Sequence, residues 1–406
     1  RAKRPALFMM SYGGTDVVNH LFGPYHPPLR PGVSSEEYRR YWPTVANYYS
    51  EVDRLIGIFG TNEGLPNEPD GIFQPPPAPR CNELWVKGAA DKLGITCVPG
   101  RLSIITKPLN GRPACHYCGQ CNRGCRTHSN FSSPGVLLAP AMATGNLTIL
   151  PNSMVREVTI NGLGHATGVN FVNRDTGGDE HIRGKIVILA ASACESARLL
   201  LNSKSAQFTE GLANSSGKVG RYLMDSTGAW VGGYFDKMRD TPAHNHDGVG
   251  GMHLYMPWWL EGKKLDFPRG YHIEFGGGRG MPGYGAMGGI QNYPPGGGYG
   301  ADLKKDYRSW YGATLGFAGR GEMIANENSF CEIDNNVVDR YGIDALADQL
   351  ADGDPLGREL QRELVDDPAG RWTRSPLGKV IRRCRRRRAP RDPSTPPCGA
   401  VDRPRW

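Results

Sequence analysis

Four cysteines lie close together in one short stretch of the chain, with the spacing C-x2-C-x2-C-x3-C. They are Cys115, Cys118, Cys121 and Cys125. Short, regular gaps let several thiolates converge on one inorganic centre, and this spacing is typical of cysteines that bind an iron–sulfur cluster. The run occurs once and is followed by Arg126 rather than proline, so three or four of its thiolates would bind a single centre.

Zinc and disulfide bonds are the alternative explanations for this run of cysteines. A structural zinc site with four cysteines usually takes them as two pairs separated by a longer insert, which this run lacks. Disulfides between such close neighbours would be strained. The spacing therefore favours an iron–sulfur cluster, with zinc, disulfides and unliganded cysteines as the alternatives.

The whole chain of 406 residues is long enough for two or three domains, and its 55 glycines and 32 prolines indicate a loop-rich protein. The net charge of +8 is concentrated near the C-terminus, because residues 381–388 hold six arginines. We therefore expect no basic face that would bind nucleic acid. No apolar stretch of about eighteen residues is present, which predicts no transmembrane segment.

Hydrophobic periodicity predicts several local elements. The predicted helices are residues 43–59, 82–92, with Gly94 ending the helix, and 193–202. The predicted strands are residues 147–150, 154–160 and 166–172, with turns at 161–162 and 175–178. The apolar run 182–191 predicts a strand buried on both faces that leads directly into the last helix.

The last two segments of the chain differ from the rest in composition. Residues 226–343 are rich in glycine and aromatic residues, but the glycines are interleaved with the strand-like sequence of residues 271–275. This favours glycine bends in a sheet over an RNA-binding repeat. From Asp344 onwards almost no apolar periodicity remains, so residues 344–406 are predicted to be disordered or non-native.

Three segments together resemble the glucose–methanol–choline (GMC) oxidoreductases, and within them the FAD subunits of bacterial gluconate, sorbitol and glucose dehydrogenases. Residues 13–20 (GGTDVVNH) resemble the family's first signature, although Asp16 departs from it. Residues 192–203 (SACESARLLLNS) resemble the second signature, although Ala197 departs from it. The third segment is the cysteine run together with residues 129–134.

The resemblance implies a fold of the α+β or α/β class. It combines part of a Rossmann-like FAD-binding domain of the GMC type with a substrate domain on an antiparallel sheet. The implied FAD contacts are Gly13, Gly14, Asn19, His20, Val155, Ala190, Ala191 and Ser192. The resemblance also implies a 3Fe-4S cluster on Cys115, Cys121 and Cys125, with Cys118 as an extra thiolate; a 4Fe-4S cluster on all four stays open.

The expected division of the chain has five parts. They are residues 1–45 as a poorly matched remnant of the flavin loop, 46–110 as a helical cap segment, 111–225 as the portion of the FAD-binding domain with the cysteine-rich loop, 226–343 as a portion of the substrate domain, and 344–406 as the tail.

Two parts of the family pattern are not found in this sequence. One is the G-x-G-x-x-G turn, whose glycines let a pyrophosphate lie against a helix N-terminus. The other is the C-terminal segment that carries the catalytic histidine. We therefore expect a chain that is incomplete at both ends, binds FAD poorly and turns over little substrate. No catalytic base is assigned, and His253 and His272 are interpreted as ordinary strand histidines.

The function implied by the resemblance is FAD-dependent oxidation of a CH–OH group of a sugar, polyol or sugar acid, with electrons passing through the iron–sulfur cluster to an electron-chain acceptor. The implied partners are a cytochrome c and a small chaperone-like subunit. The implied location is the periplasmic side of the bacterial inner membrane, or the cytoplasm if no export signal is encoded upstream. The alternative is a non-catalytic remnant that binds metal or transfers electrons.

Overall fold

The computed structural model describes residues 47–65, 70–251, 253–257, 271–279 and 299–349. These residues form two compact units, and each unit combines segments that are far apart in sequence. Unit 1 contains the described residues 137–225 and 323–349, and unit 2 contains the other described residues.

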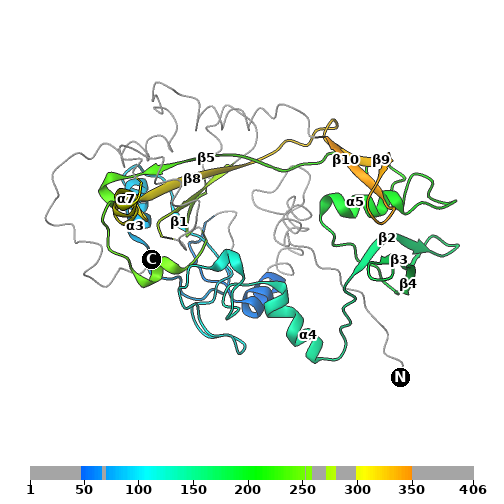
Figure 1. Ribbon diagram of the computed structural model, residues 1–406, viewed down its shortest axis with the longest axis horizontal. Coiled ribbons are helices and arrows are strands. Elements are labelled where there is room, and N and C mark those ends of the chain that lie inside the picture. The colour runs from blue at the N-terminus through cyan, green and yellow to red at the C-terminus, as the bar shows by residue number, and fades with distance from the viewer. Residues whose placement is uncertain (1–46, 66–69, 252, 258–270, 280–298, 350–406) are drawn as a thin grey trace. The chain divides into compact units, whose positions relative to one another are not determined.

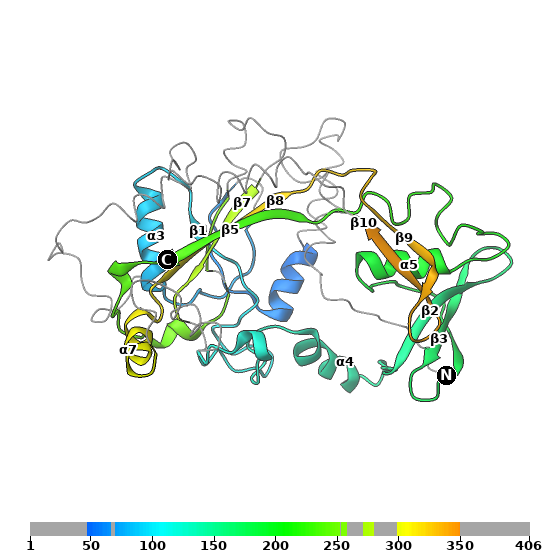
Figure 2. The same cartoon turned by 45° about the horizontal axis from the view of Figure 1, so that its top comes forward.

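Unit 2 is organised around a five-stranded sheet with the strand order β1-β6-β7-β8-β5. Its strands are β1 (Val98–Pro99), β5 (Ser226–Tyr234), β6 (Leu254–Met256), β7 (Tyr271–Gly277) and β8 (Thr314–Glu322). All neighbouring strands of this sheet pair antiparallel. Figure 2 shows β7, β8 and β5 running side by side.

The core of unit 2 lies between one face of this sheet and helix α3 (Cys81–Asp91), which Figure 1 shows beside the strands. Side chains alternate between the two faces of a strand, so Leu315 and Phe317 of β8 point to the same side. Both are buried in one apolar cluster with Val86 of α3 and Phe275 of β7. The predicted helix at 82–92 is thereby confirmed to within one residue at each end.

The remaining helical segments of unit 2 are short. They are residues 47–56, η2 (Cys121–Arg123), η4 (Asp236–Met238), η5 (Asn245–Gly248) and α7 (Ala301–Trp310), while η3 (Pro134–Leu138) lies where the chain passes into unit 1. The helix at 47–56 falls within the predicted range 43–59. Its expected apolar stripe is largely exposed, since Tyr48 and Leu55 are 64% and 52% accessible. In the part of the chain that the structure describes, no helix has the length and apolar character needed to cross a membrane.

Unit 1 contains a three-stranded antiparallel sheet, a two-stranded sheet and a helix that contacts both. The elements are α4 (Ala139–Ala143), β2 (Ser153–Ile160), β3 (Ala166–Asn173), β4 (Asp179–Arg183), α5 (Ala193–Asn202), β9 (Phe330–Val338) and β10 (Asp344–Gln349). Figure 1 shows α5 between the β9–β10 hairpin and the β2–β3–β4 sheet. The bounds of α5 agree with the predicted helix, and β2 and β3 agree with two predicted strands.

Two strand predictions in unit 1 are wrong. Residues 147–150 form no strand, and the run 182–191 continues β4 only to Arg183. Ile186 is 72% exposed rather than buried. The physical reason is the position of β4, which pairs with β3 alone among the described strands. A strand buried on both faces needs covering layers and neighbouring strands, which an apolar sequence cannot supply by itself.

The fold class is confirmed in its coarse form, because helices and antiparallel sheets are mixed as in an α+β protein. The parallel strand order of a Rossmann-like sheet is not observed within the described ranges, where all pairs of named strands are antiparallel. Residues 344–349, which were predicted to belong to the disordered tail, form strand β10. Residues 350–406 lie outside the described residues.

A buried guanidinium ties α5 to the β9–β10 hairpin. The Arg198 side chain is 10% exposed, and its Nη2 atom lies 2.9 Å from Asp339 Oδ2. Its Nε and Nη2 atoms also donate to the carbonyl oxygens of Asp344 and Ile343 at 2.7 and 3.0 Å. Hydrogen bonds to charged groups are among the stronger ones in proteins, so this contact fixes the helix on the hairpin.

We predict that Arg198→Met lowers the free energy of unfolding of unit 1 by about 2–3 kcal/mol, because two carbonyls and a carboxylate lose a charged donor. Chemical denaturation followed by circular dichroism measures the change. Arg156→Ala is the matched control, since its pair with Asp179 is exposed (38% and 67%) and should contribute less than about 1 kcal/mol. Equal losses in both variants would contradict the anchoring role.

Candidate functional site

Of the residues expected to contact FAD, Gly13, Gly14, Asn19 and His20 lie outside the described residues. The others lie in unit 1: Val155 is in β2, and residues 190–192 form the turn that leads into α5.

The turn before α5 has an unusual backbone. Ser192 has φ +76° and ψ 173°, a conformation that residues other than glycine rarely adopt. The Ala191 N–H donates to Ser196 Oγ at 3.2 Å, and the Ser192 carbonyl accepts from the Ser196 N–H at 3.0 Å, so the first turn of the helix holds this conformation. Backbone outliers of this kind are concentrated at ligand-binding sites.

The other predicted contact, Val155, lies beside an irregularity in β2. The pairing register with β3 shifts between Val155 and Glu157, which interrupts the ladder at this point. Helix α5 packs against β2, and the Val158 N–H donates to Ser203 Oγ at 2.8 Å. Val155 and the turn at residues 190–192 therefore belong to neighbouring elements of unit 1, because β2 and α5 are in contact.

In unit 2 the cysteine loop, residues 115–125, packs closely on a second loop. We call residues 248–251, Gly-Val-Gly-Gly, the glycine loop. The Gly119 N–H donates to the Gly248 carbonyl at 2.8 Å. A Cβ atom on Gly250 would lie 2.6 Å from Cys121 Sγ, and one on Gly248 would lie 1.9 Å from the Tyr117 carbonyl oxygen. Only residues without a side chain permit this approach.

The four thiols of the cysteine loop have different surroundings. Cys115 and Cys121 pack against the apolar cluster of Phe59, Ile104 and Val249, and burial raises the pKa of both thiols. Cys118 is exposed.

Cys125 differs from the other three. Burial alone would raise its pKa, but hydrogen bonds from Thr127, Asn130 and Ser129 outweigh burial and lower it to about 7. The Cys125 sulfur therefore accepts hydrogen bonds from the segment that follows it in the chain.

The arrangement of these four cysteines is not that of a preformed metal site. Among the residues described, no three or more His, Cys, Asp or Glu side chains are grouped so that they could hold a metal ion. The iron–sulfur cluster therefore stays a prediction from the spacing of the cysteines.

A buried charge network lies behind the glycine loop. Glu83 in the first turn of α3 is fully buried and contacts the side chains of Arg80 and His253. Arg80 Nε donates to Glu83 Oε1 at 2.6 Å, and His253 Nδ1 lies 3.2 Å from the same oxygen. Burial alone would raise the pKa of Glu83, but the hydrogen bond from His253 and the charge of Arg80 lower it to about 2.

His253 links this network to the glycine loop. Its Nε2 atom lies 2.9 Å from the Gly250 carbonyl, while Nδ1 faces the Glu83 carboxylate. Both of these neighbours are hydrogen-bond acceptors, so His253 joins the Glu83 carboxylate to the glycine loop. The sequence analysis interpreted His253 as an ordinary strand histidine, and it did not find Arg80 or Glu83. The only local signal for that pair is the i, i+3 spacing of opposite charges.

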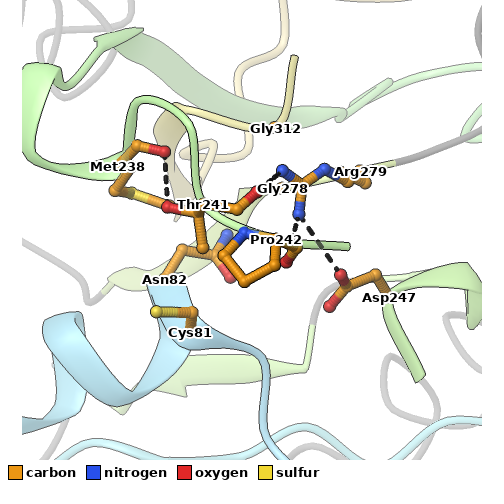
Figure 3. A pocket seen from close by; sticks show the side chains of 9 residues that line it. All are labelled: Cys81, Asn82, Met238, Thr241, Pro242, Asp247, Gly278, Arg279 and Gly312. Carbon is orange, nitrogen blue, oxygen red and sulfur yellow. Dashed lines mark hydrogen bonds and ion pairs between the residues drawn. The ribbon is translucent and has the colours of Figure 1, made fainter. Parts of the chain in front are cut away.

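A small pocket lies at the start of α3 in the same unit (Figure 3). Asn82 is 1% exposed, and its Nδ2 atom has no hydrogen-bond partner among the described groups. Arg279 reaches across the pocket to the carbonyls of Thr241 and Pro242 and lies 3.6 Å from Asp247 Oδ2. The space suits a water-sized molecule, which could accept a hydrogen bond from Asn82.

Comparison with known proteins shows which family part of the chain resembles. Residues 75–227, which include the cysteine loop and the Ser192 turn, match the family model of GMC oxidoreductase. The match covers less than half of the chain, which over this segment is similar to the GMC oxidoreductases, a family of oxidoreductase enzymes. The resemblance inferred from the sequence is confirmed.

Three curated relatives illustrate the match. The chain is 28% identical over 313 residues to 2-methyl-1,2-propanediol dehydrogenase of Mycolicibacterium austroafricanum, which covers 75% of this chain and 55% of that protein. It is 30% identical over 207 residues to paromamine 6'-oxidase of Streptomyces fradiae, covering 48% and 36% of the two chains. It is 26% identical over 204 residues to fructose dehydrogenase large subunit of Gluconobacter japonicus, covering 47% and 36%. The chain thus spans about half or less of the length of these relatives.

We predict that Glu83→Gln destabilises unit 2 by about 3–5 kcal/mol, because the buried Arg80 keeps its charge without a counter-charge and His253 loses a charged partner. The low pKa of Glu83 also predicts a pH dependence for the unsubstituted protein. The contribution of ionised Glu83 to the stability of unit 2 is present above pH 4.5 and is lost as the pH falls towards about 2. Denaturant midpoints between these pH values measure both effects.

Asp91→Asn provides the control, because it removes the exposed pair with Lys87 on the same helix and should change stability by less than about 1 kcal/mol. If the acid-dependent loss of stability persisted unchanged in Glu83→Gln, the network would not be its source.

Proposed function

We propose that this chain is part of an FAD-dependent dehydrogenase that oxidises a CH–OH group of a sugar, polyol or sugar acid. The observation that carries the proposal is the Ser192 backbone at the start of α5, inside the segment matched by the family model. The names of two relatives, a propanediol dehydrogenase and a fructose dehydrogenase, support an alcohol or sugar as the substrate class.

The residues that would hold FAD are the Val155 backbone and the turn at residues 190–192. Two alanines and a serine occupy that turn, and small side chains let a backbone approach a ligand closely. When bound, FAD accepts a hydride from the carbon that carries the hydroxyl group. No catalytic base is assigned in this chain. The role that we propose for its own residues is therefore to bind and orient the cofactor.

We further propose an iron–sulfur cluster on the cysteine loop, supported by the spacing of Cys115, Cys118, Cys121 and Cys125. The described cysteines do not form a preformed metal site, so we derive no electron-transfer step through the cluster. Iron and acid-labile sulfide in stoichiometric amounts in anaerobically purified protein would support the cluster. Stoichiometric zinc without iron would overturn it.

Partner subunits are a related proposal. One relative is named as a large subunit, which supports assembly of this chain with further subunits, for which we propose a cytochrome c and a small chaperone-like protein. The periplasmic side of the inner membrane is the proposed location. Co-purification of a haem-containing polypeptide from the periplasmic fraction would support both proposals, and a lone chain in the cytoplasmic fraction would contradict them.

For the FAD site, we predict that Ala191→Leu lowers FAD retention at least tenfold, because the larger side chain would fill the space that the cofactor needs. Absorbance near about 450 nm after reconstitution and desalting measures retention. Ala143→Leu is the control, since it makes the same change at an exposed position of α4. Equal retention in all three proteins would overturn the proposed contact. A protein that binds iron but never FAD would support a non-catalytic electron-transfer module instead.

A further inference from the structure

The small pocket at the start of α3 is lined by segments that are far apart in the chain (Figure 3). Cys81 and Asn82 are the first two residues of the helix. Residues 238–247 contribute from the loop between β5 and β6, and Gly278 and Arg279 directly follow β7. The pocket therefore exists only in the folded unit 2.

The Asn82 side chain is an unsatisfied donor inside this pocket. The residue is 1% exposed, and its Nδ2 atom has no hydrogen-bond partner among the described groups. A Cβ atom on Gly277 would lie 3.1 Å from Nδ2, and one on Gly278 would lie 3.2 Å from it. The missing side chains of the two glycines thus leave room in front of the amide. A buried donor without a partner is unfavourable, so we expect an acceptor from outside the chain.

Several acceptors that line the pocket already accept hydrogen bonds from the protein. Arg279 donates to the carbonyl oxygens of Thr241 and Pro242. The Asp247 carboxylate accepts from the His244 N–H at 2.8 Å. A bound water molecule would bring two donors of its own, which need acceptors in turn. A group that only accepts, which means an anion, matches the unpaired amide better.

The electrostatics of the pocket also favour an anion. The N-terminus of an α-helix carries a partial positive charge, and its first N–H groups have no partner inside the helix. Two carboxylates in this region are already paired, because Asp247 faces Arg279 at 3.6 Å and Glu83 is paired with Arg80. The positive end of α3 can therefore attract a further negative charge.

We propose that this pocket binds one small monovalent anion of the size of chloride, with the Asn82 amide as a donor to it. The space suits a single water-sized particle, which is too small for a phosphate or sulfate group. The bound anion joins the start of α3 to the turn after β7, so it should stabilise the folded form of unit 2. This site is separate from the turn proposed to contact FAD and does not depend on the proposed function.

Unfolding of the full chain at constant ionic strength tests the site. Sodium chloride replaces sodium methanesulfonate, whose anion is too large for the pocket. Chloride that binds only the folded protein should raise the folding equilibrium constant about elevenfold when its concentration is about ten times its Kd. Tryptophan fluorescence reports on unit 2, because the described tryptophans Trp85, Trp230 and Trp310 all lie in it.

Asn82→Asp is the decisive variant, because it keeps the shape of the side chain and replaces the donor with a carboxylate that repels an anion. We expect its chloride effect to fall at least fivefold. Asn245→Asp is the matched control, since it makes the same change at an exposed residue of η5 in the same unit and should keep the full effect. No chloride effect in the unsubstituted protein, an equal effect in Asn82→Asp, or an equal loss in both variants would overturn the site.

Crystals of the unsubstituted full chain grown in sodium bromide give a second test, which holds even if Asn82→Asp does not fold. Bromide replaces chloride and scatters anomalously, so we expect one anomalous peak in contact with Asn82 Nδ2. A water molecule at that position would overturn the proposal. A bromide peak without any chloride effect in solution would also overturn it, because the pocket would then hold an adventitious ion only.

Discussion

A carboxylate with no access to solvent, Glu83, is the constraint on which much of unit 2 depends. A buried charge is strongly unfavourable unless opposite charges and hydrogen bonds surround it. Arg80 supplies one partner from the residue that caps α3, and His253 supplies the other from just before β6. His253 then contacts the Gly250 carbonyl, so the same network sets the position of the glycine loop that supports the cysteine loop.

In both candidate regions, the cysteine loop and the turn before α5, small residues let the backbone approach a neighbouring group closely. In unit 2 the missing side chains of Gly248 and Gly250 make room for the cysteine loop. In unit 1 the small residues before α5 and the unusual backbone of Ser192 leave the main chain accessible. The first arrangement is satisfied by contacts within the protein, while the second lies in the turn that we propose contacts FAD.

The family match and the geometry support the function at different levels. The segment that matches the GMC oxidoreductase family model includes the Ser192 turn and the cysteine loop.

Local sequence determined the elements whose signals lie within a few residues of each other. The helix α5 at 193–202, the helix α3 ended by Gly94 and the strands β2 and β3 around their turn all follow from periodicity and turn residues. The cysteine spacing and the second family signature could also be read directly, and they indicated the resemblance to the GMC oxidoreductases.

Tertiary structure decided the features that depend on residues far apart in the chain. The run after Arg183 is apolar, yet Ile186 is exposed because no other described strand covers it. The pairing of Glu83 with His253 has no local signal, and neither does the pocket in which Asn82 and Arg279 meet. Periodicity and turn residues act over a few positions only, so only the folded unit could bring these side chains together.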